Sequence, residues 1–175
     1  MKVVTNSGPL IALGKLGLLD VLFHLYGSVR IPTAVYIEVG VRGSERNYPD
    51  ALLTRIAVQR GQLRVSRISD VDVPPDIASL PLNTGEKQAI YLALHDSADL
   101  VLLDDLKARE EAQARGLTIK GTLGVLIQAH QQGALQLDET QAIIETIRDR
   151  NDIWIAPGLC QRVLEKLETR RTEES

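Results

Sequence analysis

Short aliphatic stretches alternate along this chain with longer amphipathic segments, and this alternation limits the possible folds more than any other feature of the sequence. The clearest stretch, Leu100 to Leu103, contains no polar residue, as expected of a strand that is buried on both faces. Strands that alternate with helices form βαβ crossovers, in which helices cover both faces of a mainly parallel sheet. The sequence therefore predicts an α/β protein.

Glycines and prolines indicate where most of the elements end. Gly17 and Gly27, for example, each follow an apolar segment at the position where a helix usually stops. The segment 70–81 holds three prolines and is predicted to be a loop. The predicted helices span residues 9–16, 18–26, 33–42, 50–60, 84–95, 106–115, 122–132, 138–150 and 158–168, and the predicted strands span 2–5, 28–31, 62–68, 100–103, 118–120 and 153–156.

The segment 33–42 is ambiguous. Its apolar residues alternate as in a strand, yet Thr33 would suit the N-cap of a helix. We favour a helix, which places Glu38 three residues after Val35 on the same, inward face.

Length and composition predict one soluble domain. A chain of 175 residues suits a single core, which we expect over residues 1–167, with a charged and disordered tail at 168–175. Cys160 is the only cysteine, so no disulfide can form within the chain, and a reducing compartment fits. The sequence shows neither a signal peptide nor about 20 consecutive apolar residues, so we expect a cytoplasmic protein that does not span a membrane.

The net charge of −3 argues against a protein that coats nucleic acid through bulk positive charge. It leaves open an enzyme that combines a local acidic site with a local basic rim. Six arginines between residues 42 and 67 could form such a rim, although a solvated surface is the simpler interpretation.

Oxygen-bearing side chains are predicted to gather at one edge of the sheet. Asn6 follows the first strand, Asp104 and Asp105 follow the strand 100–103, and Glu38 and Glu86 lie near helix starts. In parallel sheets, ligands bind beyond the carboxyl ends of the strands. Carboxylate and amide oxygens suit Mg²⁺ or Mn²⁺, which can activate water for attack on a phosphodiester. The sequence therefore predicts a site for a hard divalent cation.

Each of these residues also has a purely structural interpretation. Glu86 could form a capping box with Asn83, and Glu38 could be a solvated side chain. One aspartate of the pair 104–105 should cap the helix that follows, and Asn6 could bond to its own backbone in a turn.

Two further residues could contact a substrate. Arg109 could bind a phosphate group, although an ion pair with Asp105 or a solvated position is the simpler interpretation. Thr122 could line the site or could cap the next helix. The histidines lack zinc-ligand spacing, and the sequence shows neither a nucleophilic triad nor a P-loop.

Four segments together resemble the PIN-domain family over residues 2–165: the run 3–13, Gly85-Glu86-Lys87-Gln88-Ala89-Ile90, the run 102–109, and Gly116-Leu117 with the later run 121–126. The resemblance implies a three-layer α/β/α Rossmann-like sandwich and a Mg²⁺- or Mn²⁺-dependent ribonuclease. It also implies the toxin component of a toxin–antitoxin pair, with RNA as substrate and a small antitoxin protein as partner. Carried over by position, the site consists of Asn6, Glu38, Glu86 and Asp105, with Asp104 as the competitor or helper of Asp105.

Alternatives remain at this stage. The general family has an aspartate at the position of Asn6, so a second hypothesis is a catalytically weak binding module that acts through a partner protein. A phosphatase with an aspartyl nucleophile would need a second aspartate two residues later, and the sequence supplies none at this edge. The apolar helices between Leu10 and Leu25 also predict an interface, either in a homodimer or with a small partner.

Overall fold

The computed structural model describes residues 1–45 and 48–173. It divides into two compact units. The sheet unit comprises residues 1–122, and the C-terminal unit comprises the residues from 123 onward.

The sheet unit is built on five parallel strands in the order β3-β2-β1-β4-β5, which confirms the predicted parallel sheet. The central strand β1 pairs with β2 on one side and with β4 on the other, so that Val3 lies opposite Val29 and Leu100. The strands span Val3–Thr5 (β1), Val29–Pro32 (β2), Leu63–Ser66 (β3), Leu100–Leu102 (β4) and Ile119–Lys120 (β5).

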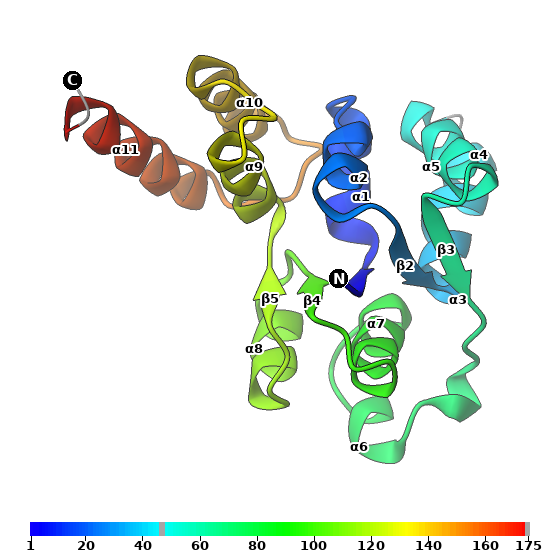
Figure 1. The fold of residues 1–175 in the computed structure, drawn as a ribbon. Helices are drawn as coiled ribbons and strands as arrows, with labels where there is room; N and C mark the ends of the chain where they lie inside the picture. Colours follow the sequence, from blue (N-terminus) through cyan, green and yellow to red (C-terminus); the bar gives the residue numbers. More distant parts are fainter. Residues whose placement is uncertain (46–47, 174–175) are drawn as a thin grey trace. The chain divides into compact units, whose positions relative to one another are not determined.

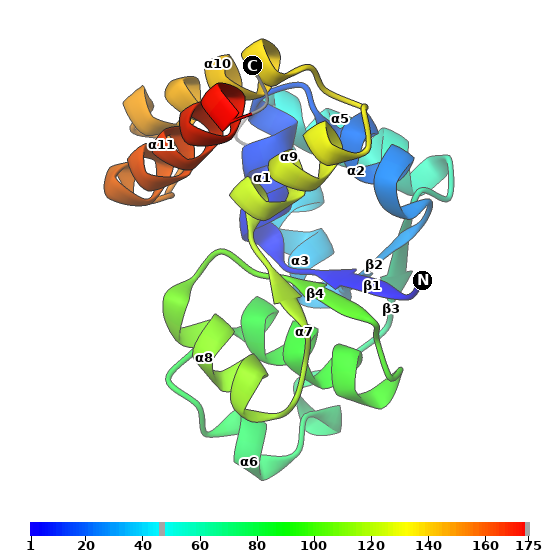
Figure 2. The same cartoon turned by 60° about the vertical axis from the view of Figure 1, so that its left-hand side comes forward.

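Helices cover both faces of this sheet, as a three-layer α/β/α sandwich requires (Figures 1 and 2). On one face lie α1 (Ser7–Lys15), α2 (Leu19–Tyr26) and α5 (Pro49–Gln59). On the other lie α6 (Pro75–Ala78), α7 (Thr84–His95) and α8 (Leu106–Ala114). Between β2 and α5 the chain forms α3 (Thr33–Tyr36), the π-helix η1 (Ile37–Arg42) and α4 (Gly43–Glu45).

Aliphatic side chains fill both interfaces between sheet and helices. Val4 and Val101 point from neighbouring strands into a cluster that includes Ala89 and Ile90 of α7. Side chains alternate across a strand, so the neighbours of Val4, such as Val3, point toward the opposite layer. Leu10 and Leu13 of α1 and Leu22 of α2 are fully buried in the sheet unit. Burial of this kind is the main driving force for folding in a chain so poor in aromatic residues.

The structure corrects several local predictions. The segment 33–42 is helical, as predicted, but most of it is π-helix rather than α-helix. Thr33 is the first helical residue instead of the cap, and its hydroxyl bonds to Ser66 and Ile68 of the neighbouring chain segment. The proline-rich segment 70–81 contains the 3₁₀ turn η2 (Asp70–Asp72) and α6, because Pro75 can occupy the first turn of a helix.

The C-terminal unit is helical in its described part. It contains most of α9 (Thr122–Gln131), followed by α10 (Leu137–Asp149) and α11 (Pro157–Glu173), and α10 packs against α11. The strand predicted at 153–156 does not form: Ile153 and Ile155 are buried, but all strands of the described chain belong to the sheet unit. The helix α11 continues past Glu168 into the segment expected to be a disordered tail, of which residues 174–175 lie outside the described residues.

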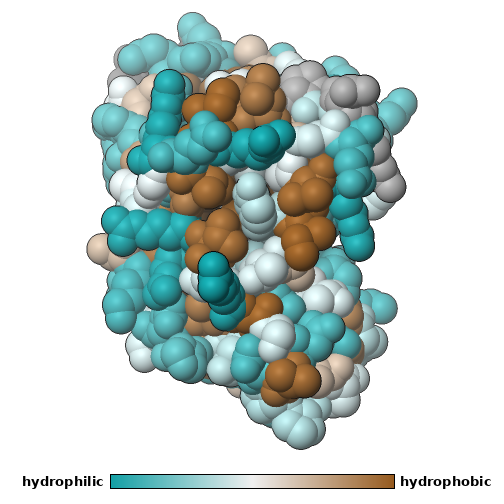
Figure 3. All heavy atoms as spheres, turned by 90° about the vertical axis from the view of Figure 1, so that its right-hand side faces the viewer, coloured by the Kyte–Doolittle hydropathy of each residue, from teal (hydrophilic) through white to brown (hydrophobic). Residues whose placement is uncertain are grey.

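Four of the exposed apolar side chains in the described part of the sheet unit lie on η1 and α5, and none lies in the segment expected to form an interface. The large apolar residues between Leu10 and Leu25 are buried or half-buried. Ile37 and Val41 of η1 and Leu52 and Leu53 of α5 are exposed instead. Hydrophobic side chains are visible among polar ones on the side of the molecule in Figure 3.

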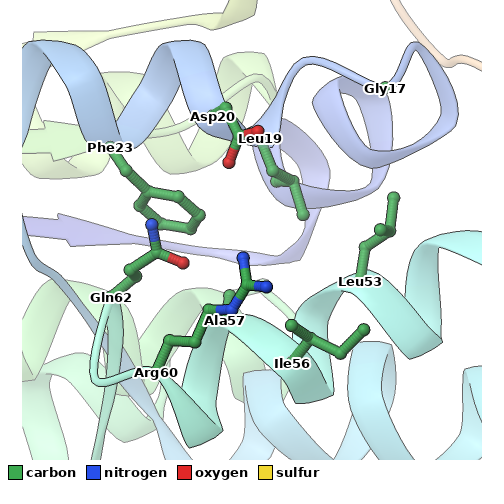
Figure 4. A pocket seen from close by; sticks show the side chains of 9 residues that line it. All are labelled: Gly17, Leu19, Asp20, Phe23, Leu53, Ile56, Ala57, Arg60 and Gln62. Atoms are coloured by element: carbon green, nitrogen blue, oxygen red, sulfur yellow. The ribbon is translucent and has the colours of Figure 1, made fainter.

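A hollow of about 190 Å³ lies between α2 and α5 (Figure 4). Its lining is mixed: Phe23 and Ile56 supply apolar surface, while Asp20 and Arg60 supply charge. Because Gln62 of the lining directly precedes β3, the hollow lies toward the amino ends of the strands. It is therefore separate from the edge where the predicted site residues lie.

Candidate functional site

The carboxyl ends of β1 and β4 bring three of the predicted site residues to one edge of the sheet. Asn6 directly follows β1, and its backbone N–H donates to the carbonyl of Leu102 at the end of β4 over 3.2 Å. Asp104 and Asp105 follow β4 two and three residues beyond that carbonyl. The edge expected from the sequence therefore exists, and the central strands position it.

Asn6 is buried and caps α1. Its side-chain Oδ1 accepts a hydrogen bond from the backbone N–H of Gly8 over 3.2 Å, and this satisfies one of the donors left unpaired at a helix start. A Cβ atom on Gly8 would lie 3.6 Å from Asn6 Oδ1 and 3.5 Å from Asp104 Oδ2. The amide of Asn6 and the carboxylate of Asp104 therefore flank the same first turn of α1.

Glu38 reaches this edge from the π-helix η1. Its carboxylate Oε2 accepts a hydrogen bond of 2.5 Å from the hydroxyl of Ser7, the first residue of α1. The same oxygen lies 3.6 Å from the position that a Cβ on Gly85 would occupy. The side chain is exposed but faces the start of α7, and π-helical turns are frequent at functional sites.

Glu86 forms the capping box that the sequence allowed. Its backbone N–H donates to Asn83 Oδ1 over 2.9 Å, and its Oε2 accepts from the Asn83 N–H over 3.1 Å. The residue is only 8% exposed. Burial raises the pKa of its carboxyl group, and the negative charges of Asp105 and Glu38 raise it further. Three carboxylates thus lie close enough to influence one another.

The two adjacent aspartates differ in their surroundings. Both oxygens of Asp104 are bound by Thr122: the backbone N–H donates to Oδ1 over 2.7 Å and the hydroxyl to Oδ2 over 2.6 Å. Burial raises the pKa of Asp104, although the bonds from Thr122 and the charge of Arg109 act in the opposite direction. Asp105 is exposed and caps α8, where its Oδ1 accepts from the Ala108 N–H over 2.9 Å.

Arg109 and Thr122 are both engaged with this edge of the sheet unit. Arg109 Nη1 donates to the carbonyl of Leu103 over 3.2 Å, and the guanidinium lies beside Asp104 rather than in the ion pair with Asp105 that the sequence suggested. A Cβ on Gly121 would lie 2.7 Å from Arg109 Nη1, so only glycine fits there as the side chain is placed. Thr122 is the first residue of α9 and binds Asp104 instead of capping the helix.

The donor set suits a hard divalent cation in its chemistry, since every candidate ligand is an oxygen. Glu38, Glu86 and Asp105 each use one oxygen in a hydrogen bond, and the other has no such partner within residues 1–45 and 48–173. Nevertheless, no group of three acidic, histidine or cysteine side chains in the described chain is arranged to hold a metal ion. A cation at this edge would therefore be bound through the oxygens that these hydrogen bonds leave unused.

Sequence reasoning missed two residues that contact these elements. Ser7 follows Asn6 at the start of α1, and a hydroxyl in the first turn of a helix is a weak signal that could have been noted. Gln88 is buried in α7 and binds the start of α3, but nothing local to its sequence indicates that contact.

The model of one protein family, described as the PIN domain, matches residues 2–169 of the sequence. This chain belongs to the PIN-domain family. The match covers the whole sheet with its candidate site, and it confirms the resemblance seen in the sequence. PIN domains are nuclease-type folds, which agrees with acidic residues at the carboxyl ends of a parallel sheet.

A search of curated proteins finds no significant match to this PIN domain. Within the described residues, no helix is both long and apolar enough to cross a lipid bilayer.

Proposed function

We propose that this PIN-domain protein is a Mg²⁺- or Mn²⁺-dependent endoribonuclease whose cation ligands are Asn6, Glu38, Glu86 and Asp105. The observation that carries the proposal is the environment of Glu86. Burial raises the pKa of its carboxyl group, and the negative charges of Asp105 and Glu38 raise it further. Such repulsion is unfavourable unless a bound cation offsets it, and clustered carboxyl groups with perturbed pKa values are typical of functional sites.

The two aspartates have different roles in this proposal. Asp105 is exposed, and its Oδ2 is free of hydrogen bonds in the described chain, so it is the ligand. Asp104, bound through both oxygens to Thr122, holds the end of β4 against the start of α9. Arg109 lies beside Asp104, and in this proposal its guanidinium binds a substrate phosphate.

A divalent cation bound by these oxygens would activate a water molecule and offset the negative charge that builds on a phosphodiester during attack. The contribution of the chain itself is positional. Asn6 is fixed by its cap on α1, and Glu38 is held by Ser7. Glu86 is excluded from water by burial, which strengthens its electrostatic interactions.

A toxin role, with an antitoxin as partner, extends this proposal. The exposed apolar side chains on η1 and α5 supply a surface that a second protein or a second copy of the chain could cover. Because η1 also carries Glu38, a protein bound there would lie next to the proposed ligands. Sedimentation of the purified protein, alone and with proteins recovered by affinity capture, tests for both kinds of partner.

A second candidate function is a PIN-type binding module that cleaves RNA poorly. Asn6 favours it, because an amide oxygen ligates a hard cation without contributing charge, and this amide is already used in capping α1. The module would bind RNA or a partner without a requirement for Mn²⁺.

One experiment tests the proposal and separates the two candidates. Purified protein is incubated with a mixture of structured and single-stranded RNAs, with Mn²⁺ or with EDTA. We expect cleavage only with Mn²⁺, and we expect Asp105→Asn to abolish it, since this variant keeps an acceptor for the Ala108 N–H but loses the charge. Asp20→Asn is the control, because Asp20 is an exposed acidic residue in the first turn of α2 and lines the hollow toward the amino ends of the strands, not the candidate site.

Three outcomes would contradict the nuclease proposal. Cleavage that persists in EDTA excludes the cation mechanism, and cleavage by Asp105→Asn at the wild-type rate excludes the site. RNA binding without any cleavage would favour the binding module.

A further inference from the structure

Gln88 lies in α7 two residues after Glu86, and its side chain is almost completely buried, with 4% exposed. Both ends of its amide are used. Oε1 accepts a hydrogen bond from the backbone N–H of Ala34 over 3.1 Å, and Nε2 donates to Asp70 Oδ1 over 3.1 Å. One side chain therefore joins three segments: α7, the start of α3 and the turn η2.

The contact with Ala34 stabilises a helix start that lacks its own cap. The residue before α3 is Pro32, which provides no side-chain acceptor, so the first backbone donors of α3 need partners from elsewhere. Gln88 supplies one of them from a different helix. Thr33 also links the start of α3 to the end of β3 and the residues after it, because its hydroxyl donates to the Ser66 carbonyl and accepts from the Ile68 N–H.

The start of α3 and Glu38 belong to one continuous helical segment. The helix α3 passes into η1 without a break, and Glu38 is four residues beyond Ala34 on this continuous helical segment. The facing part of α7 begins with Gly85 and Glu86, and a Cβ on Gly85 would lie 3.4 Å from Val35 Cγ2. A change in the distance between α7 and α3 at Gln88 would therefore also change the distance between the carboxylates of Glu38 and Glu86.

We propose that Gln88 is a positioning residue that sets the spacing between Glu38 and Glu86, and so tunes the cation affinity of the site. This inference rests on the proposed function, because it assumes that both carboxylates bind one divalent cation. Gln88 itself touches neither the cation nor the substrate. Outer residues that orient ligands in this way commonly change metal affinity by about tenfold or more when they are replaced.

Four variants separate positioning from simple stabilisation. Gln88→Met keeps the length of the side chain but removes both hydrogen bonds. Gln88→Glu keeps an acceptor for the Ala34 N–H but sets a second carboxylate against Asp70. Adding Asp70→Asn to Gln88→Glu restores this hydrogen bond in the opposite direction, because the new amide at position 70 can donate to the new carboxylate at position 88. Ile90→Val is the control, since it removes buried volume from the same helix without touching these contacts.

The measurement is thermal unfolding of the full chain across a titration of Mn²⁺, together with hydrogen exchange of the Ala34 amide without metal. We expect the Mn²⁺ concentration at half-maximal stabilisation to rise about tenfold in Gln88→Met, with faster exchange at Ala34. The double variant should return close to the wild-type midpoint. Ile90→Val should lower the melting temperature of the apo protein without moving the Mn²⁺ midpoint.

The outcomes distinguish a failure of this inference from a failure of the proposed function. A wild-type protein that does not respond to Mn²⁺ overturns both. A wild-type response that Gln88→Met retains with an unchanged midpoint overturns only the positioning role. If Ile90→Val shifts the Mn²⁺ midpoint as much as Gln88→Met does, Gln88 contributes only to the stability of the fold and has no positioning role.

Discussion

Ser7 Oγ donates a 2.5 Å hydrogen bond to Glu38 Oε2, and this bond joins the first turn of α1 to the π-helix η1. Ser7 is buried, whereas Glu38 is exposed. A free glutamate on a surface samples many rotamers, and fixing it costs about 1 kcal/mol or more of conformational entropy. The hydroxyl therefore holds in place a carboxylate that would otherwise be disordered.

Ser7→Ala should weaken cation binding more than it weakens the fold. Loss of one hydrogen bond to an exposed partner should lower the free energy of unfolding by about 1 kcal/mol. The Mn²⁺ affinity should fall about fivefold, because Glu38 must then be ordered on binding. Thermal melts across a Mn²⁺ titration measure both effects.

The control for this variant is Ser44→Ala. Ser44 also donates its hydroxyl to an oxygen of the η1 region, the Gly40 carbonyl, over 2.6 Å, but it contacts no carboxylate. Equal Mn²⁺ midpoints in the Ser7 and Ser44 variants would show that the bond to Glu38 has no bearing on the site.

Glu86→Gln should stabilise the metal-free protein at neutral pH. The pKa of Glu86 is raised in the folded state from an ordinary value of 4.5, chiefly by burial. As the pH rises through 4.5 the unfolded chain loses this proton first, so ionisation of Glu86 lowers stability between 4.5 and the higher folded pKa. The neutral variant escapes this loss.

Urea unfolding at pH 4 and pH 7 measures the effect of Glu86→Gln. The variant should be more stable than the wild type at pH 7, and the difference should shrink toward pH 4. Added Mn²⁺ should reverse the order, because the variant lacks a charged ligand. Glu110→Gln on the exposed face of α8 serves as the control. If the stability difference between Glu86→Gln and the wild type does not change with pH, the pKa of Glu86 is not raised by burial.

Asp104→Ala should be among the more destabilising single changes at this edge. It removes the acceptors of the Thr122 N–H and hydroxyl, and Thr122 is fully buried. Each unsatisfied buried donor costs about 1–3 kcal/mol, so we expect a loss of about 3 kcal/mol in total. Asp104→Asn, which keeps the shape and an acceptor, should lose less than about 1 kcal/mol.

Chemical denaturation of the two Asp104 variants distinguishes the structural role from a ligand role. If both variants unfold like the wild type but lose their Mn²⁺ response, Asp104 is a cation ligand, and its hydrogen bonds to Thr122 do not stabilise the fold. If only Asp104→Ala is unstable and Asp104→Asn still binds Mn²⁺, the assignment to Asp105 stands.

Local signals in the sequence were enough to predict most of the fold. The strand at Leu100 to Leu103 was recognisable because burial on both faces leaves only apolar residues in such a strand. The capping box of Asn83 and Glu86 and the cap at Asp105 were also predictable, because caps depend on residues only three positions apart. The parallel sheet then placed Asn6 beside the aspartates.

Features that depend on distant contacts could not be predicted. The sequence at Ile37–Arg42 fits a regular helix, but the segment forms a π-helix. It is tightly packed: a Cβ on Gly40 would lie 2.9 Å from the Tyr36 ring, and one on Gly43 would lie 2.8 Å from the Ala51 side chain. The contact between Gln88 and Ala34 spans 54 positions in the sequence. The division of roles between Asp104 and Asp105 likewise depends on Thr122, which is 18 residues from Asp104.

Asn6→Asp is the most direct test of the proposed cation site. The change keeps the Oδ1 acceptor for the Gly8 N–H, so the cap of α1 should survive. It adds a negative charge beside Asp104, and like charges at a partly buried edge are unfavourable without a cation. The metal-free variant should therefore melt at a lower temperature than the wild type.

With Mn²⁺ the same charge should become favourable. At an effective dielectric constant near 20, a unit charge about 4 Å from another is worth roughly 4 kcal/mol before desolvation, and desolvation and repulsion should leave about 1 kcal/mol, or nearly fivefold in affinity. Mn²⁺ should thus raise the melting temperature of Asn6→Asp more than that of the wild type. Asn151→Asp is the control, because it adds the same charge at an exposed position of the C-terminal unit, outside the sheet unit that carries the proposed ligands. If Mn²⁺ shifts the melting temperatures of Asn6→Asp and the wild type equally, Asn6 only caps α1 and takes no part in binding the cation.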